Sequence, residues 1–146
     1  MILSQQQIMS DKQEVTSSTL STNVIDLKKA GVPYGAVGLE SDMGKGEPVG
    51  LLISVNKDVL AAGSATVEMA LEVSDNEDMS SSTVVYSTGA VAKADLVKGY
   101  KIPFRTLPVG VNKQYLAVRY TVATGPLTAG EFTAALTNGD NGSWNT

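Results

Sequence analysis

The clearest pattern of alternating apolar and polar positions in this chain lies near its C-terminal end. From Tyr115 to Ala123 every second residue is large and apolar, and the residues between them are small or polar. Because successive side chains of a strand point to opposite faces, this period of two predicts a strand half buried against a core. Its inward face is formed by Leu116, Val118, Tyr120 and Val122.

A second alternating run follows after a short break. The segment 124–126, which reads Thr-Gly-Pro, interrupts the pattern, and the alternation resumes over 131–137. The inward residues of this run are Phe132, Ala134 and Leu136. Two strands separated by a loop of this length predict an antiparallel hairpin. Since a hairpin with one apolar face needs a second sheet to cover it, this part of the chain already predicts two packed β layers.

Shorter runs of the same kind recur along the rest of the chain. They cover residues 22–27, 49–55, 66–73, 84–88 and 100–107. The run 66–73 places Glu68 and Glu72, together with Thr66 and Ala70, on the solvent side. Pro103 puts the last run at an edge or a bulge, because proline has no N–H for the ladder. About seven to nine strands at spacings of roughly 8–12 residues are typical of an all-β sandwich or barrel with little helix.

Three segments lack this regularity. Residues 1–21 mix a few apolar side chains with Gln, Ser and Thr, which predicts an extended N-terminal arm that would gain by packing on a neighbour. A single helical turn beginning at Ser4 is the alternative for this arm. Residues 34–48 are rich in glycine and predict a long loop of the kind that often contacts a partner. The sandwich is then expected over 22–137, followed by an irregular tail over 138–146.

Composition narrows the chemistry that the chain can perform. Its 146 residues are enough for one domain with its own core. It has no cysteine and no histidine, which removes disulfides, thiolate metal sites, the usual general base and the commonest metal ligand. The net charge of −4 and the scattered basic residues argue against nucleic acid as a partner. We also expect no membrane span and no secretion signal, because no run approaches the ~18 apolar residues of a span.

Three sets of polar residues could carry chemistry, and each has an ordinary structural explanation. The segment 38–44 resembles a phosphate-binding loop, but five residues separate its glycines instead of four, and Lys45 is followed by glycine. The carboxylates within 75–78 could gather around calcium, but they lack the order of a known calcium loop and suit a solvated turn. Glu68 and Glu72 could form a glycosidase-like pair, but charge on an outer strand face is ordinary. We therefore expect no cofactor, no metal and no catalytic residue.

Larger stretches of the sequence resemble a known family. They are Thr22 to Leu27 (TNVIDL), Gly44 to Pro48 (GKGEP), Tyr115 to Pro126 and Thr128 to Gly130 (TAG). From about Ile2 to Leu136 the chain resembles the small capsid cement proteins of tailed bacteriophages with short tails. The resemblance implies a jelly-roll protein on the outside of a phage head. There it would bridge neighbouring subunits of the major capsid protein and reinforce the shell against the pressure of the DNA.

Pattern and resemblance together predict an all-β, jelly-roll-like antiparallel β-sandwich that is a structural virion protein and not an enzyme. The expected partners are the major capsid protein and the chain itself, as a homodimer across a local two-fold axis or, alternatively, as a trimer. The residues expected at capsid or subunit contacts are Ile2, Leu3, Ile8, Met9, Tyr34, Lys45 and Trp144. The alternative function is a carbohydrate-binding jelly roll for host recognition, which would use exposed aromatic residues. A cupin-type enzyme is disfavoured because its metal site is rich in histidine.

Overall fold

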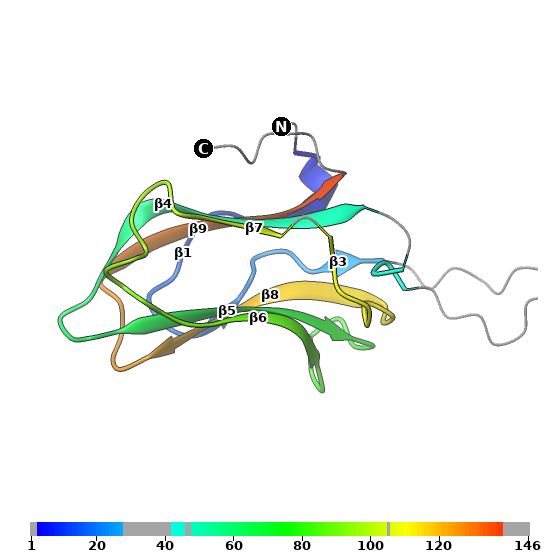
Figure 1. Ribbon diagram of the computed structural model, residues 1–146. Coiled ribbons are helices and arrows are strands. Elements are labelled where there is room, and N and C mark those ends of the chain that lie inside the picture. Colours follow the sequence, from blue (N-terminus) through cyan, green and yellow to red (C-terminus); the bar gives the residue numbers. More distant parts are fainter. Residues whose placement is uncertain (1–2, 28–41, 46–47, 105, 139–146) are drawn as a thin grey trace, which may run out of the picture.

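The computed structural model describes residues 3–27, 42–45, 48–104 and 106–138, which form two antiparallel β-sheets packed face to face (Figure 1). The strands are β1 (Ile8–Glu14), β2 (Thr19–Leu20), β3 (Ile25–Asp26), β4 (Val49–Leu60), β5 (Thr66–Ser74), β6 (Thr83–Ala92), β7 (Lys101–Phe104), β8 (Tyr115–Ala123) and β9 (Ala129–Asn138). A single 3-10 turn, η1 (Gln5–Gln7), precedes β1. Within these described ranges no helix is long and apolar enough to cross a membrane.

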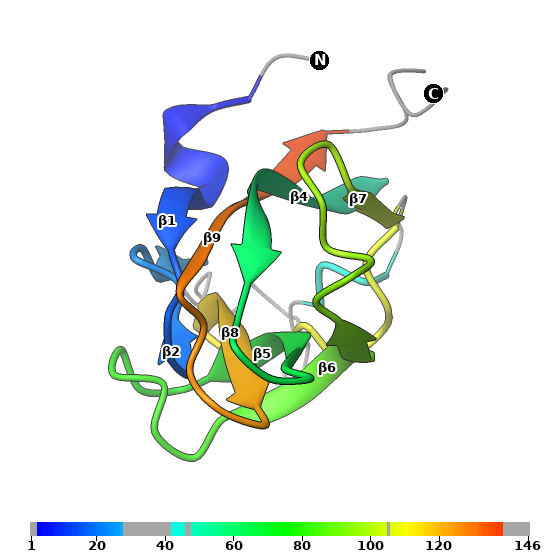
Figure 2. The same ribbon diagram turned by 90° about the vertical axis from the view of Figure 1, so that its left-hand side faces the viewer.

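Each sheet combines strands from distant parts of the chain. Sheet A has the order β1-β9-β4-β7, and sheet B has the order β2-β8-β5-β6, with β3 also paired to β8. Consecutive strands therefore lie in different sheets at six points, namely β1 to β2, β3 to β4, β4 to β5, β6 to β7, β7 to β8 and β8 to β9. The end-on view shows the two layers facing each other (Figure 2). Two packed sheets with this interleaved order form a jelly roll. The predicted all-β sandwich is thus confirmed.

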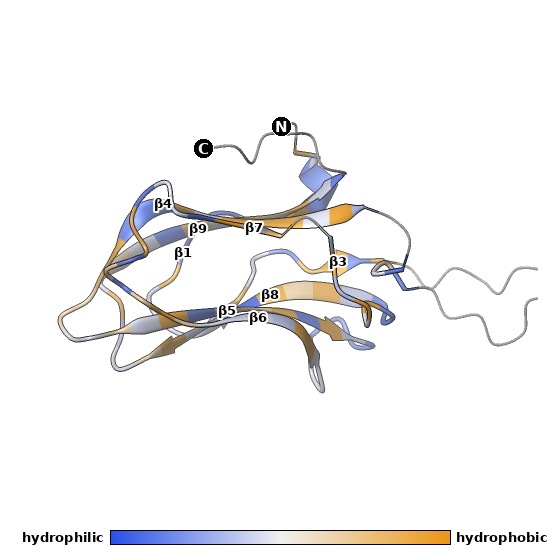
Figure 3. Ribbon diagram, in the orientation of Figure 1, coloured by the Kyte–Doolittle hydropathy of each residue, from blue (hydrophilic) through white to orange (hydrophobic). Residues whose placement is uncertain are grey.

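The core lies between the two sheets and is built from the inward residues of the alternating runs. In β8, Leu116, Val118 and Tyr120 are fully buried, and Phe132 and Ala134 are fully buried in β9. The rings of Tyr120 and Phe132 meet across the two layers with their centroids 5.2 Å apart, a favourable spacing for an aromatic pair. Hydrophobic stretches accordingly lie along strands of both layers, whereas η1 is polar (Figure 3).

The hairpin predicted for β8 and β9 is wrong, because the two strands belong to different sheets. β8 pairs with β5 in sheet B, whereas β9 pairs with β4 and β1 in sheet A. The residues between them cross the end of the sandwich, where Leu127 is buried and its N–H donates to the carbonyl of Thr16. Alternation cannot separate these two arrangements, because both turn the same residues of each strand towards one core.

Residues 8–14 and 19–20, predicted as part of an N-terminal arm, instead form two strands of the sandwich. β1 pairs with β9 and β2 pairs with β8. Met9 is fully buried, and the hydroxyl of Tyr120 donates a 3.0 Å hydrogen bond to the Oγ of Ser10, which is also buried. Two register shifts against β9 interrupt the alternation of β1, which explains why the pattern of this segment did not reveal a strand.

Candidate functional site

Most of the polar residues singled out by the sequence meet at one end of the sandwich. Three segments form this end, and we call them together the loop end: residues 42–45, 75–82 and 107–114. The N–H of Met43 donates to the carbonyl of Val111 at 3.2 Å, which joins the first segment to the third. The Nζ of Lys113 lies 4.0 Å from a carboxylate oxygen of Asp75, which brings the second segment to the same place.

Asp42 fastens the end of the predicted glycine-rich loop to the sandwich. One of its carboxylate oxygens accepts a 2.8 Å hydrogen bond from the N–H of Gly44, and the other accepts a 2.9 Å bond from the N–H of Gly110. Desolvation raises the pKa of Asp42, but these two N–H groups and the charge of Lys45 outweigh it, so the pKa lies below its ordinary value of 3.8. The ionised carboxylate therefore holds two segments of the loop end together at neutral pH.

Gly44 allows these two segments to approach closely. A Cβ atom at this position would lie 2.1 Å from the carbonyl oxygen of Pro108, far inside van der Waals contact. The neighbouring Lys45 is exposed, and Val109 on the facing segment is 64% exposed. The close backbone contact therefore holds the two segments together, and each exposes one side chain to solvent: Lys45 on the first and Val109 on the second.

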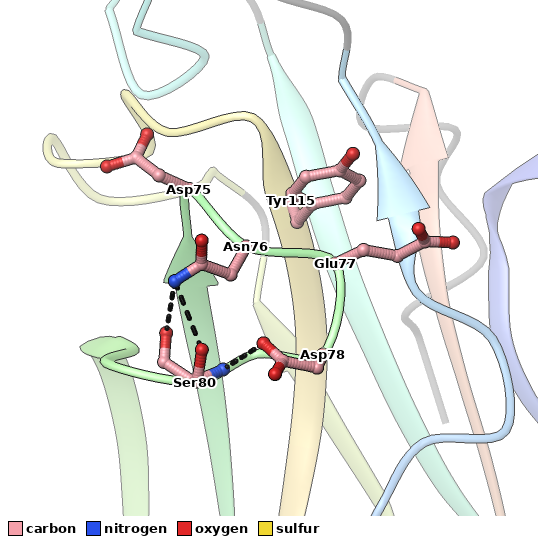
Figure 4. A pocket seen from close by; sticks show the side chains of 6 residues that line it. All are labelled: Asp75, Asn76, Glu77, Asp78, Ser80 and Tyr115. Carbon is pink, nitrogen blue, oxygen red and sulfur yellow. Dashed lines mark hydrogen bonds between the residues drawn. The ribbon is translucent and has the colours of Figure 1, made fainter.

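The acidic connection between β5 and β6 is an ordered turn (Figure 4). The Oγ of Ser74 is buried and donates to the carbonyl of Ser80 at 2.7 Å, while the N–H of Ser80 donates to Asp78 Oδ1 at 2.9 Å. The hydroxyl and N–H of Ser80 lower the pKa of Asp78 below its usual value. Met79 turns inward and is only 2% exposed, so this polar connection is anchored by an apolar side chain that the sequence analysis did not single out.

The carboxylates of this turn border an open depression of about 620 Å³, together with Tyr115. The side chains of Asp75 and Glu77 point in opposite directions, and Asp78 points back to its own turn (Figure 4). A hard cation needs several oxygen ligands that converge. Among the described residues no three or more acidic side chains are placed to hold a metal ion. The geometry matches a solvated acidic rim better than the calcium loop considered from the sequence.

Glu68 and Glu72 have different hydrogen-bond partners and share none. Glu72 was predicted to face solvent but is 5% exposed, because Arg119 Nε lies 2.9 Å from both of its oxygens and the hydroxyl of Ser82 donates to it at 2.8 Å. Glu68 accepts a hydrogen bond from the hydroxyl of Ser87. The backbone of an extended strand rises ~13 Å over four residues, which is the separation expected between the Cα atoms of Glu68 and Glu72. Catalytic carboxylates of glycosidases are only about 5–9.5 Å apart.

The residues expected at contacts have different surroundings. Lys45 is exposed, while Leu3 and Ile8 are half-buried. Met9 is fully buried, so its prediction as a contact residue is wrong: its side chain fills the core of its own chain. Three further predicted contact residues lie outside the described residues, namely Ile2, Tyr34 and Trp144.

A comparison with known protein families gives a match. A family model described as Bbp16 matches residues 9–136. The match begins within β1 and ends within β9, so it takes in every strand of the sandwich that the structure describes. No curated protein matches the sequence.

Proposed function

The chain belongs to the Bbp16 family, and on this premise we propose that it is a structural protein of a phage virion. It binds the outer surface of the head, bridges neighbouring subunits of the major capsid protein and stabilises the shell. The family name suggests a phage-related protein. The likeness of the sequence to capsid cement proteins supports the more specific assignment.

The observation that best supports this proposal is that the charged side chains bind other parts of the same chain. Asp42 and Asp78 bind backbone N–H groups, and Glu72 binds Arg119. The remaining carboxylates of 75–78 point away from one another (Figure 4). In the described part of the chain Asp42 and Asp78 hold loop backbone and Glu72 pairs with the neighbouring strand, whereas an active site would aim several charged groups at one reacting atom. A rigid sandwich with ordered loops suits attachment to a surface.

We place the capsid contact at the loop end. Val109 is the most exposed large hydrophobic residue of the described part, and it lies on a loop that Asp42 and Gly44 hold in position. Exposed Lys45 stands next to this support. An apolar centre with a polar rim is typical of protein contact surfaces, and a loop that is already ordered loses little entropy on binding. Symmetry repeats the contact over the head, so modest individual contacts suffice.

Co-sedimentation with phage heads that lack this protein tests the proposal. The wild-type chain is expected to pellet with the heads and to saturate at a fixed ratio to the capsid subunit. Val109→Asp is expected to weaken binding by about tenfold or more. Leu60→Asp is the matched control, because Leu60 is 55% exposed at the opposite end of β4 and is expected to be neutral. Undiminished binding of the Val109 variant would refute the contact surface, and absence of wild-type binding would refute the function.

The alternative function, carbohydrate binding, can be tested at Tyr115. Tyr115 borders the acidic depression, where a sugar could stack on its ring (Figure 4). Tyr86 packs on Phe104, and Tyr120 packs on Phe132, so these four rings are engaged within the sandwich. Retention on a glycan array that disappears in Tyr115→Ala would favour this alternative over attachment to a capsid.

A further inference from the structure

The outer face of sheet A carries a row of apolar residues that we call the outer row: Ile8, Ala135 and Leu52. Ala135 of β9 lies opposite Leu52 of β4 on one side and opposite Ile8 of β1 on the other. The residues next to them in their strands belong to the core between the two sheets, whereas the outer row does not (Met9, Leu51, Ile53, Ala134 and Leu136). Because alternate residues of a strand point to opposite faces, the outer row is turned away from sheet B. Even so, Leu52 is 4% exposed and Ala135 is 0% exposed.

A buried hydroxyl without a hydrogen-bond partner lies beside the outer row. Thr137 follows Ala135 by two residues in β9 and so shares its face. It is 2% exposed, and its Oγ1 has no hydrogen-bond partner. Buried polar atoms of native proteins nearly always have one. Whatever covers this face should therefore combine an apolar surface with a group that can bond to this hydroxyl.

The described segment on this side of sheet A is mostly polar. The turn η1 lies on the side of sheet A that faces away from sheet B and contacts β9 (Figure 1). It consists of three glutamines, none of which is buried. Its contact is a hydrogen bond of 2.8 Å from Gln7 Nε2 to Asn138 Oδ1, and only Leu3 among residues 3–7 is apolar. These residues therefore supply little apolar cover for the outer row.

Residues 139–146, which lie outside the described residues, contain a side chain with both properties. Their sequence is GDNGSWNT, and Trp144 is the only tryptophan of the chain. The indole ring is large and apolar, and it carries one N–H that needs an acceptor when buried. The Asn-Gly pairs at 138–139 and 141–142 favour a reversal of the chain directly after β9. Eight extended residues reach ~26 Å, and the three strand spacings of sheet A amount to only ~14 Å, so the segment is long enough to return over the sheet.

We propose that residues 139–146 fold back over the outer face of sheet A, so that the indole of Trp144 packs on the outer row and its N–H donates to Thr137 Oγ1. The occupant is the chain itself because the segment begins at Asn138, beside Thr137, so that docking closes only a short loop. Trp144 then stabilises the sandwich, in place of the capsid contact expected from the sequence. This inference goes beyond the proposed function and does not depend on it.

Tryptophan fluorescence of the full chain tests this docking, because the whole signal comes from Trp144. The folded wild-type chain is expected to emit at a shorter wavelength than the chain unfolded in urea, and to resist quenching by acrylamide. Leu52→Gln places a polar group under the ring and should shift the emission towards that of the unfolded chain, while circular dichroism shows that the sandwich is retained. Leu60→Gln is the matched control, because Leu60 is exposed and lies eight residues further along β4, ~26 Å away. It should leave the emission unchanged.

Thr137→Val gives a second readout that does not depend on how well the Leu52 variant folds. Valine keeps the shape of the side chain and removes the acceptor, so quenching of Trp144 by acrylamide should increase. Thr133→Val is its control on the same strand, since the Thr133 hydroxyl already bonds to Lys12 N–H and to Asn56 Oδ1. It should leave the quenching as in the wild type.

Four results would overturn the docking. They are a wild-type emission that equals that of the unfolded chain, an emission that a folded Leu52→Gln variant leaves in place, equal quenching in the two threonine variants, and protection of Trp144 that disappears on dilution. The last result would place the indole on a second copy of the chain. Failure to bind phage heads would leave the docking untouched, because that result addresses the proposed function.

Discussion

Breaking the ion pair between Glu72 and Arg119 should destabilise the fold far more than its position on an outer sheet face implies. The side chain of Glu72 is 6% exposed and that of Arg119 is 36% exposed. Arg119→Met removes the cation and leaves the carboxylate buried with the hydroxyl of Ser82 as its remaining side-chain donor. Removing one partner of a fully buried pair costs about 3–5 kcal/mol. Exposed pairs contribute only about 0.2–1 kcal/mol.

The magnitude expected for this pair lies between those limits, because Arg119 is partly solvated. We expect Arg119→Met to lower the free energy of unfolding by about 2 kcal/mol. Glu72→Gln should cost less, since an amide oxygen still accepts from Ser82 and the guanidinium group reaches water. The double variant should therefore be more stable than the sum of the two single losses predicts, with a coupling energy of about 1 kcal/mol.

Urea unfolding of the two single variants and the double variant gives this coupling energy. The control is the pair Lys57–Glu131, whose atoms are 3.8 Å apart and whose side chains are 55% and 32% exposed. Its coupling energy should be below about 0.5 kcal/mol. A coupling energy between Glu72 and Arg119 no larger than that of the control would show that Glu72 is not desolvated. It would refute the claim that this ion pair stabilises sheet B.

Three further predictions concern the loop end and the core. Gly44→Ala should lower stability by about 1–3 kcal/mol because its Cβ would overlap a facing backbone carbonyl. Gly63→Ala, whose Cβ would have its nearest neighbour at 3.7 Å, should have little effect, and equal melting temperatures would contradict the close approach. Ser10→Ala should cost about 1–3 kcal/mol in urea unfolding, since it leaves the buried Tyr120 hydroxyl without its acceptor, and adding Tyr120→Phe should recover part of the loss. The pKa of Asp42 is lowered in the fold, so its stabilisation is present above pH 3.8 and is lost as the pH falls through the lowered value. Asp42→Asn should therefore lose less stability on acidification than the wild-type chain, and identical pH profiles would contradict this.

The inward faces of the strands could be predicted from the sequence because burial imposes a period of two that is visible in one strand at a time. The buried residues of β8 and β9 follow that period. The edge position predicted from Pro103 is also confirmed, since β7 ends sheet A. Which strands are neighbours was a different question. β8 and β9 are adjacent in sequence but face each other across the core, and alternation is the same in either case.

The contacts of the outer faces could not be predicted, because they depend on register between strands that are far apart in sequence. Glu72 and Arg119 are 47 residues apart and meet only because β5 pairs with β8 in one particular register. Met79 lies in a polar run and is buried only because the turn, with Met79 itself at a φ of 57°, folds its side chain inward. The only signal in the sequence was one large apolar residue among acidic and hydroxyl residues.

The most direct test of the proposed function is cryo-electron microscopy of phage heads that lack this protein, before and after the purified chain is added. We expect added density of sandwich shape at symmetry-related positions on the outer surface, each copy touching more than one capsid subunit. The temperature at which the heads break open should rise in parallel, because a ligand that binds only the intact shell stabilises it by mass action. Heads that show no ordered added density and break at an unchanged temperature would contradict the proposal.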